Sequence, residues 1–145
     1  MKEAINDKVM FVYYDLEGQI AMESVWAVKE ENGYRIKNIP FFAPNIAYDD
    51  LISVEDDDGE LFFDDIIDES GNSTIQIIIN NESDIDYITK KIESFDCGWE
   101  ESHLKGYISV NVPKEISYLP VKSFLSNELE NKKLDFKEAC MAHNM

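Results

Sequence analysis

Short runs of β-branched and aromatic residues, separated by turn residues, fill the first half of this 145-residue chain. Such runs are too short for helices and are typical of strands. Strands are predicted at residues 8–14, 20–29, 34–37, 51–55 and 60–67. Asn32-Gly33 and Asp58-Gly59 predict type I′ hairpin turns, in which both central residues need a positive φ. Five strands in so short a segment indicate a small, strongly curved barrel or sandwich.

The second half mixes strand alternation with helical spacing, beginning after the turn residues Ser70-Gly71-Asn72. Ser83 is a suitable N-cap for a first helix, and Pro120 suits the first turn of a second one. Strands are predicted at residues 73–80, 99–102, 107–112 and 134–139. The resulting order, βαββαβ, is the ferredoxin-like arrangement, with both helices on one face of an antiparallel sheet.

These elements predict an α+β fold in two parts. An N-terminal β-rich, barrel-like part spans residues 1–69, and a ferredoxin-like βαββαβ part with a short C-terminal tail spans residues 70–145. The change from hairpin signals to mixed strands and helices sets this boundary.

The aromatic stretch 38–50 is predicted to organise the rest of the chain. Pro40 and Pro44 each remove a backbone donor, so neither a helix nor a central strand continues through it. A connection of this kind usually crosses the end of a small barrel or joins two sheets. Tyr48 should be partly buried with its hydroxyl hydrogen-bonded. The predicted core residues are Ile39, Phe41 or Phe42, Ile46 and Trp26.

The charge of the chain is concentrated in its middle. The net charge is −17, and residues 38–89 contain fourteen Asp and Glu but no Lys or Arg. Without clustered bases we expect neither nucleic acid nor an anionic membrane surface as a partner. The acidity either serves only solubility or forms a docking face for a basic protein. The predicted partner-binding residues are Asp56, Asp57, Asp58, Glu60, Asp64, Asp65, Asp68 and Glu69.

No motif for catalysis, a cofactor or a metal is recognisable. Consecutive acids at 56–58 do not have the alternate spacing of a calcium-binding loop, and 70–74 lacks the Lys of a phosphate loop. Cys97 and His103 lack a third orienting group, and the two Cys and two His lack the paired spacing of a zinc site. We therefore expect no cofactor and no enzyme.

Three further absences in the sequence bear on the compartment of the protein. The chain has neither an apolar signal core at its start nor an apolar run of the roughly 20 residues that span a bilayer. Its two cysteines form no disulfide framework. These features predict a soluble cytoplasmic protein with reduced thiols.

Several segments in order along residues 8–140 resemble a bacterial family of unknown function, DUF4265. They are 23–27, 33–43, 46–48, 70–74, 101–102, 112–113, 118–121 and 135–140. Asp49 stands where members tend to have Gly, and Asn72 where they tend to have His. No role that depends on that His is carried over. The family has no established activity to carry over, and its small, acidic, bacterial character is similar to that of immunity proteins.

The leading functional hypothesis is a cytoplasmic binding protein that inhibits a basic partner, as an immunity protein against a nuclease-type toxin. A nuclease site is basic because it binds phosphate, so an acidic surface can occupy it. Phe62 or Phe63 is the expected aromatic anchor. The alternative is an uncharacterised bacterial regulatory or structural module without catalytic activity, whose acidity serves only solubility.

Overall fold

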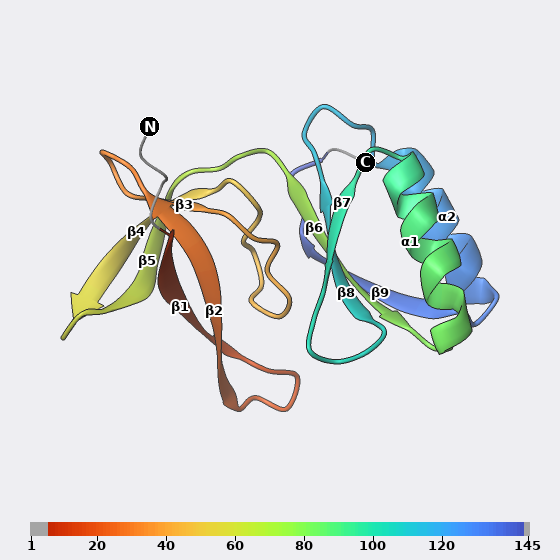
Figure 1. Cartoon of the computed structure of the whole chain (residues 1–145), viewed down its shortest axis with the longest axis horizontal. Helices are drawn as coiled ribbons and strands as arrows, with labels where there is room; N and C mark the ends of the chain where they lie inside the picture. The colour runs from red at the N-terminus through yellow and green to blue at the C-terminus, as the bar shows by residue number, and fades with distance from the viewer. Residues whose placement is uncertain (1–5, 144–145) are drawn as a thin grey trace.

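Nine strands, two α-helices and one short 3₁₀ helix make up residues 6–143, which the computed structural model describes (Figure 1). The strands are β1 (Asn6–Tyr14), β2 (Ile20–Lys29), β3 (Tyr34–Ile36), β4 (Leu51–Asp57), β5 (Glu60–Asp68), β6 (Ser73–Ile79), β7 (Gly98–Glu101), β8 (Tyr107–Val112) and β9 (Leu134–Cys140). The helices are η1 (Glu82–Asp84), α1 (Ile85–Ser94) and α2 (Leu119–Glu130). The predicted α+β class is confirmed. No helix in this part of the chain is both long and apolar enough to cross a membrane.

Strands β1 to β5 close on themselves as a barrel in chain order. Successive strands are antiparallel, whereas β1 and β5 close the barrel as a parallel pair, with Val9 opposite Leu61. Inside the barrel, the rings of Phe11 and Phe63 stack with their centroids 4.7 Å apart. Closure gives each of the five strands two neighbours, so none of them presents a free edge.

Strand β2 shows that the prediction of Trp26 as a core residue is wrong. Its inward positions are Glu23, Val25 and Ala27, while Trp26 lies on the outer face and is 45% exposed. Side chains alternate between the two faces of a strand, so burial of Val25 and Ala27 sends Trp26 outward. There its ring lies 5.1 Å from the Lys8 ammonium.

Only one of the two predicted type I′ turns has the expected backbone. Asp58 and Gly59 have φ values of 53° and 88°, as such a turn requires. Asn32 and Gly33 do not have positive φ, and a four-residue connection closes there instead, with Glu30 N donating to Gly33 O at 2.7 Å. Glycine is needed at position 33 for space, because a Cβ would collide with the carbonyl oxygen of Ile52.

The remaining strands form an antiparallel sheet in the order β7-β8-β6-β9. Helices α1 and α2 lie side by side on the face of this sheet that points away from the barrel (Figure 1). Odd-numbered residues of β6, such as Ile75 and Ile77, are fully buried in the same apolar cluster as Ile88 of α1 and Leu125 of α2. Alternation on β6 therefore turns its even-numbered residues toward the barrel side.

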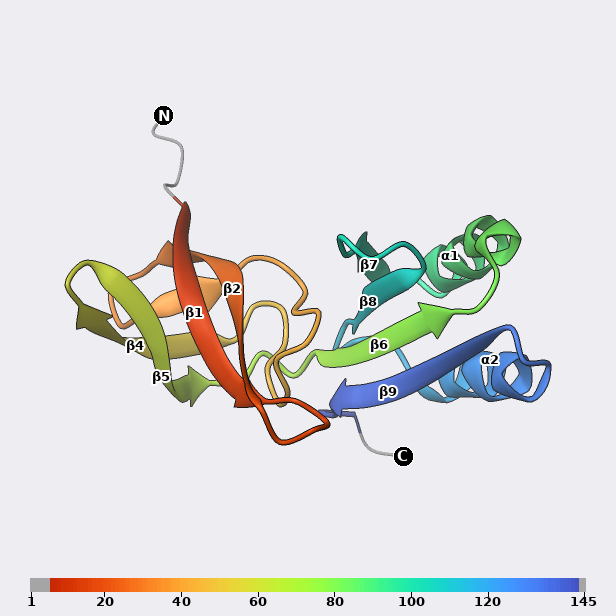
Figure 2. The same ribbon diagram turned by 90° about the horizontal axis from the view of Figure 1, so that it is seen from below.

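The stretch 38–50 connects β3 to β4 and lies between the barrel and this sheet (Figures 1 and 2). Polar side chains of the sheet bind its carbonyl groups. Thr74 Oγ1 donates to Ile46 O at 3.0 Å, and Ser109 Oγ donates to Ile39 O at 3.2 Å. Ile39 and Ile46 are buried, as predicted. The stretch therefore covers the face of the sheet that the helices leave open.

The aromatic residues of this stretch are less buried than predicted. Phe41, Phe42 and Tyr48 are all half-buried, which agrees with the predicted partial burial of Tyr48, but the Tyr48 hydroxyl forms no hydrogen bond within residues 6–143. Phe42 packs against the ring of Tyr107 with centroids 4.9 Å apart, and it lines a groove between the two parts. The apolar interior is instead completed by Ala43, Ala47 and the two isoleucines.

Candidate functional site

All eight acids predicted to contact a partner are exposed, and they lie on or directly after the β4–β5 hairpin. Their local hydrogen bonds are few. Asp56 Oδ1 accepts from Gly59 N at 2.8 Å across the turn, and Asp64 Oδ2 accepts from the Ser53 hydroxyl at 3.1 Å. The structure thus brings the eight residues together on one element.

An irregularity in the pairing of β4 with β5 explains why adjacent acids both reach solvent. Asp64 has no opposite residue in β4, because its neighbours Phe63 and Asp65 pair with consecutive residues there. This is a β-bulge, and it interrupts the alternation of inward and outward side chains. Asp64 and Asp65 are consequently both exposed.

Neighbouring bases compensate the charge of the hairpin only weakly, because Arg35, whose charge interacts with that of Asp68, is paired with Glu30. Within residues 6–143, none of the eight acids forms an ion pair with Lys or Arg. Bases of the barrel form ion pairs with other acids, for example Arg35 with Glu30 at 2.6 Å and Lys37 with Asp49 at 2.7 Å. Uncompensated like charges repel one another and attract a partner of opposite charge.

An exposed apolar ladder runs along the outer face of β1 and β2, beside this hairpin. In it Val12 faces Met22 and Tyr14 faces Ile20, and these four side chains are 54–73% exposed. Met10 continues the same face of β1 and pairs with Phe62 of β5. Apolar surface of this kind often marks a protein interaction site. The sequence had not singled out these residues.

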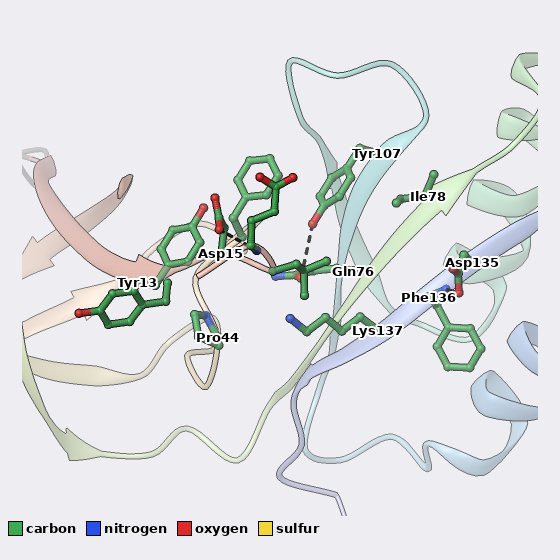
Figure 3. A pocket seen from close by; sticks show the side chains of 13 residues that line it. Tyr13, Asp15, Pro44, Gln76, Ile78, Tyr107, Asp135, Phe136 and Lys137 are labelled. Atoms are coloured by element: carbon green, nitrogen blue, oxygen red, sulfur yellow. Dashed lines mark hydrogen bonds between the residues drawn. The ribbon is translucent and has the colours of Figure 1, made fainter. Parts of the chain in front are cut away.

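A groove of about 490 Å³ separates the barrel from the sheet (Figure 3). One wall comes from the end of β1 and the β1–β2 turn, including Tyr13 and Glu17, while the other comes from β6, β8 and β9. Phe42 and Pro44 of the connecting stretch also line it. This volume is within the range of small-molecule sites.

The sheet wall of the groove carries a buried amide. Gln76 is 5% exposed, and its Oε1 accepts from the Tyr107 hydroxyl at 3.4 Å (Figure 3). Its Nε2 has no hydrogen-bond partner among residues 6–143. The Tyr107 hydroxyl shares its single proton between Gln76 Oε1 and Phe41 O, which at 2.7 Å is the closer acceptor, and burial, followed by the nearby charge of Glu23, raises the pKa of Tyr107 to about 12. This hydroxyl therefore remains a donor at neutral pH.

Two acids of low exposure hold the connecting stretch behind the groove. Glu23, which is 8% exposed, accepts hydrogen bonds from the backbone N–H groups of Phe41, Phe42 and Ala43 at 2.7–2.9 Å. Glu100 accepts from Ile39 N at 2.7 Å. Burial raises the pKa of Glu100, and the charge of Glu23 raises it further, although the bond from Ile39 opposes both.

Sequence reasoning missed Gln76 in the groove and Glu23 behind it, although the alternation of residue types contained a signal for both. Glu23 occupies an inward position of a strand, and Gln76 interrupts a run of isoleucines. A polar residue at a position otherwise filled by apolar ones needs a hydrogen-bond partner from elsewhere in the fold.

Cys97 and His103 do not form a reactive pair. Cys97 is buried and its thiol donates to Phe95 O, whereas His103 is exposed near the Phe42 ring. Burial, with a smaller effect from Asp96, raises the pKa of Cys97 to about 11, which leaves it as an unreactive thiol. In the part of the chain that the structure describes, no three His, Cys, Asp or Glu side chains are arranged to hold a metal ion.

The structure does bring one serine and one histidine together, which the sequence did not suggest. Ser73 Oγ lies 2.5 Å from Nδ1 of His143, and Nε2 of that ring lies 2.9 Å from Pro113 O. Ser73 is fully buried and its Oγ also accepts from the backbone N–H of Ala142. With no access for a substrate, this pair attaches the C-terminal segment to β6.

Comparison with known proteins supplies a family but no activity. Residues 23–136 match the domain of unknown function DUF4265, and no curated protein matches the chain. The chain is also similar to a hypothetical protein from Neisseria gonorrhoeae of known crystal structure, at 33% sequence identity and a TM-score of 0.86. That match covers 99% of this chain and 100% of the other. The protein therefore belongs to the DUF4265 family.

Proposed function

We propose that this protein is a non-catalytic, acidic binding protein that inhibits a basic protein partner in the cytoplasm. The observation that carries the proposal is the juxtaposition of an unpaired acidic hairpin with an exposed apolar ladder. Acids alone would serve solubility, but an apolar ladder beside them has the composition of an interface centre with a charged rim. The proposed partner is a nuclease-type toxin, for which this protein would be the immunity protein.

The two surfaces would make different contributions to binding. Val12, Met22 and Phe62 would form the apolar centre, where most binding energy arises. The acids of the β4–β5 hairpin would steer the basic partner and accept hydrogen bonds from its Lys and Arg side chains. Phe62 is the better aromatic anchor, because it lies on the outer face with Met10, whereas Phe63 stacks inside the barrel.

We also infer a finer description of the fold that presents these surfaces. Sheet order β7-β8-β6-β9 with the element order βαββαβ supports a ferredoxin-like unit for residues 70–145. The closed pairing of β1 to β5 supports a barrel unit for residues 1–69. The proposed binding surface belongs entirely to the barrel unit.

The test first uses the wild-type protein to capture a partner from the native bacterium. Two charge-reversed variants are then compared with the wild type in their rate of association with that partner. One carries Asp56→Lys, Asp57→Lys and Asp58→Lys. The matched control carries Glu31→Lys, Glu115→Lys and Glu130→Lys, three exposed acids outside the hairpin, so both variants change the net charge equally. The hairpin variant should associate with a captured basic protein about tenfold more slowly than the wild type or the control.

Salt and activity complete the test. Added salt should slow wild-type association, because the Debye length falls from about 10 Å at 0.1 M to about 3 Å at 1 M. The wild type should also block nucleic-acid cleavage by the captured protein. The proposal would be contradicted by a tightly bound partner whose association rate changes neither with added salt nor with reversal of the hairpin charges. A partner without nuclease activity, or none at all, would favour the regulatory or structural alternative.

A further inference from the structure

The groove between the barrel and the sheet has features that partner binding by the hairpin does not use. Gln76 is 95% buried, lines the groove and leaves its Nε2 donor unpaired within residues 6–143. An unpaired buried amide destabilises the fold unless a ligand or water accepts its hydrogen bond. A ligand that brought a hydrogen-bond acceptor to this donor would therefore satisfy it.

The sheet wall also provides a positive charge. Lys137 is directly opposite Gln76 in the pairing of β9 with β6, and both line the groove. Lys137 forms no ion pair in the described part of the chain, and Figure 3 shows its side chain extending across the groove toward the barrel. A donor and a cation on adjacent strands form a site for a carboxylate.

The barrel wall is acidic, whereas the sheet wall has both charges, because Asp135 lines the groove on the same strand as Lys137. The barrel wall contributes the rings of Tyr13 and Tyr14 with the acids Asp15 and Glu17. Asp15 is engaged in the β1–β2 turn, where its Oδ1 accepts from Glu17 N and Gln19 N at 2.9 Å. Glu17 is exposed at the rim. Aromatic rings beside a carboxylate favour a cation.

We propose that this groove binds a small zwitterion with an aromatic body, of the chemical class of an aromatic amino acid. Its carboxylate would bind Gln76 Nε2 and Lys137, and its ammonium group would face Glu17 and the tyrosines. The ring would pack against Phe42 and Pro44 between the two walls. A molecule with only a carboxylate would bind Lys137 but be repelled by Glu17. A molecule with only an ammonium group would bind Glu17 but be repelled by Lys137.

The test follows the NMR signal of the Gln76 side-chain amide as ligand is added. Gln19 and Gln76 are the only glutamines in the sequence, so a ¹⁵N-labelled sample of the full chain gives two glutamine side-chain NH₂ signals in an amide correlation spectrum. L-phenylalanine should shift the Gln76 signal more than that of the exposed Gln19, which lies in the β1–β2 turn at the barrel wall. The controls 3-phenylpropionate and 2-phenylethylamine keep the ring and one charge each, and they should bind at least about tenfold more weakly.

Variants of each wall separate the two charges. Lys137→Met should weaken L-phenylalanine and 3-phenylpropionate about tenfold but not 2-phenylethylamine. Glu17→Gln should weaken L-phenylalanine and 2-phenylethylamine but not 3-phenylpropionate. Lys90→Met, at an exposed helix position, should change none of them. The proposal is overturned if L-phenylalanine leaves the Gln76 signal in place at millimolar concentration, or if all three compounds bind equally.

Discussion

The carboxylate of Glu23 accepts a hydrogen bond from the backbone N–H of Phe41 at 2.7 Å, and it binds the next two amides as well. One acid on β2 thereby fixes the start of the connection that separates the barrel from the sheet. The two carboxylate oxygens accept all three amide hydrogen bonds, whereas a glutamine side chain has only one oxygen to accept them.

Replacing Glu23 should therefore destabilise the whole protein. Glu23→Gln places an NH₂ group against backbone donors, so the free energy of unfolding should fall by about 2–4 kcal/mol. Urea unfolding of the variant and the wild type measures this difference. The matched variant Glu60→Gln, at an exposed hairpin position, should change it by less than about 0.5 kcal/mol. Equal effects of the two substitutions would reject the role of Glu23.

Glu100 should make stability depend on pH. Its pKa is raised in the folded protein above the ordinary value of 4.5, mainly by burial. The folded state then holds this proton more tightly than the unfolded state, so the stability from this group is present below pH 4.5 and is lost as pH rises through the folded pKa. Urea unfolding of Glu100→Gln and the wild type across this range should show the wild type losing stability relative to the variant. A difference that stays constant with pH would contradict this account.

Cys97 should be protected from alkylation in the folded protein. Because burial raises its pKa from 9.0 to about 11, the thiolate fraction at pH 8 is about a hundredfold lower than for an exposed thiol. The Cys140→Ser variant isolates this thiol, and its reaction with iodoacetamide should be at least that much slower when folded than in guanidinium chloride. Rapid labelling of the folded variant would show that the thiol is accessible.

Trp26 and Ile46 should differ sharply in their contributions to stability. Ile46→Ala empties a buried position and should cost about 2–5 kcal/mol. Trp26→Ala removes a ring that is 45% exposed and contacts the Lys8 ammonium, so its cost should be about 1 kcal/mol or less. Thermal and urea unfolding compare the two variants. If Trp26→Ala lowered the free energy of unfolding more than Ile46→Ala did, Trp26 would have to be a core residue after all.

Local patterns in the sequence predicted the elements well, because alternation and helical spacing act over a few residues. The predicted strands at 20–29 and 107–112 match β2 and β8. The inward face of β2 was not predictable in the same way, since both of its faces carry apolar residues. Which face of β2 points inward depends on Glu23, and the backbone N–H groups that Glu23 binds belong to a different segment, residues 41–43.

The eight predicted partner-binding acids lie on the surface, as expected from local sequence. Charged side chains in a short hairpin are exposed to solvent because the hairpin has too little interior to bury them. The groove was not predictable, since Tyr13, Phe42, Gln76 and Lys137 come from four separate segments. Only the packing of the barrel against the sheet brings them together.

The connection 38–50 also sets the order in which the chain can fold. Asn45 N donates to Ala139 O at 2.9 Å, so the connection binds the last strand, although about two-thirds of the chain lies between these two residues. Contacts of such high contact order form slowly, because distant segments must first meet. During synthesis, the barrel can close early, but its connection to β4 finds its final partners only after β9 has left the ribosome.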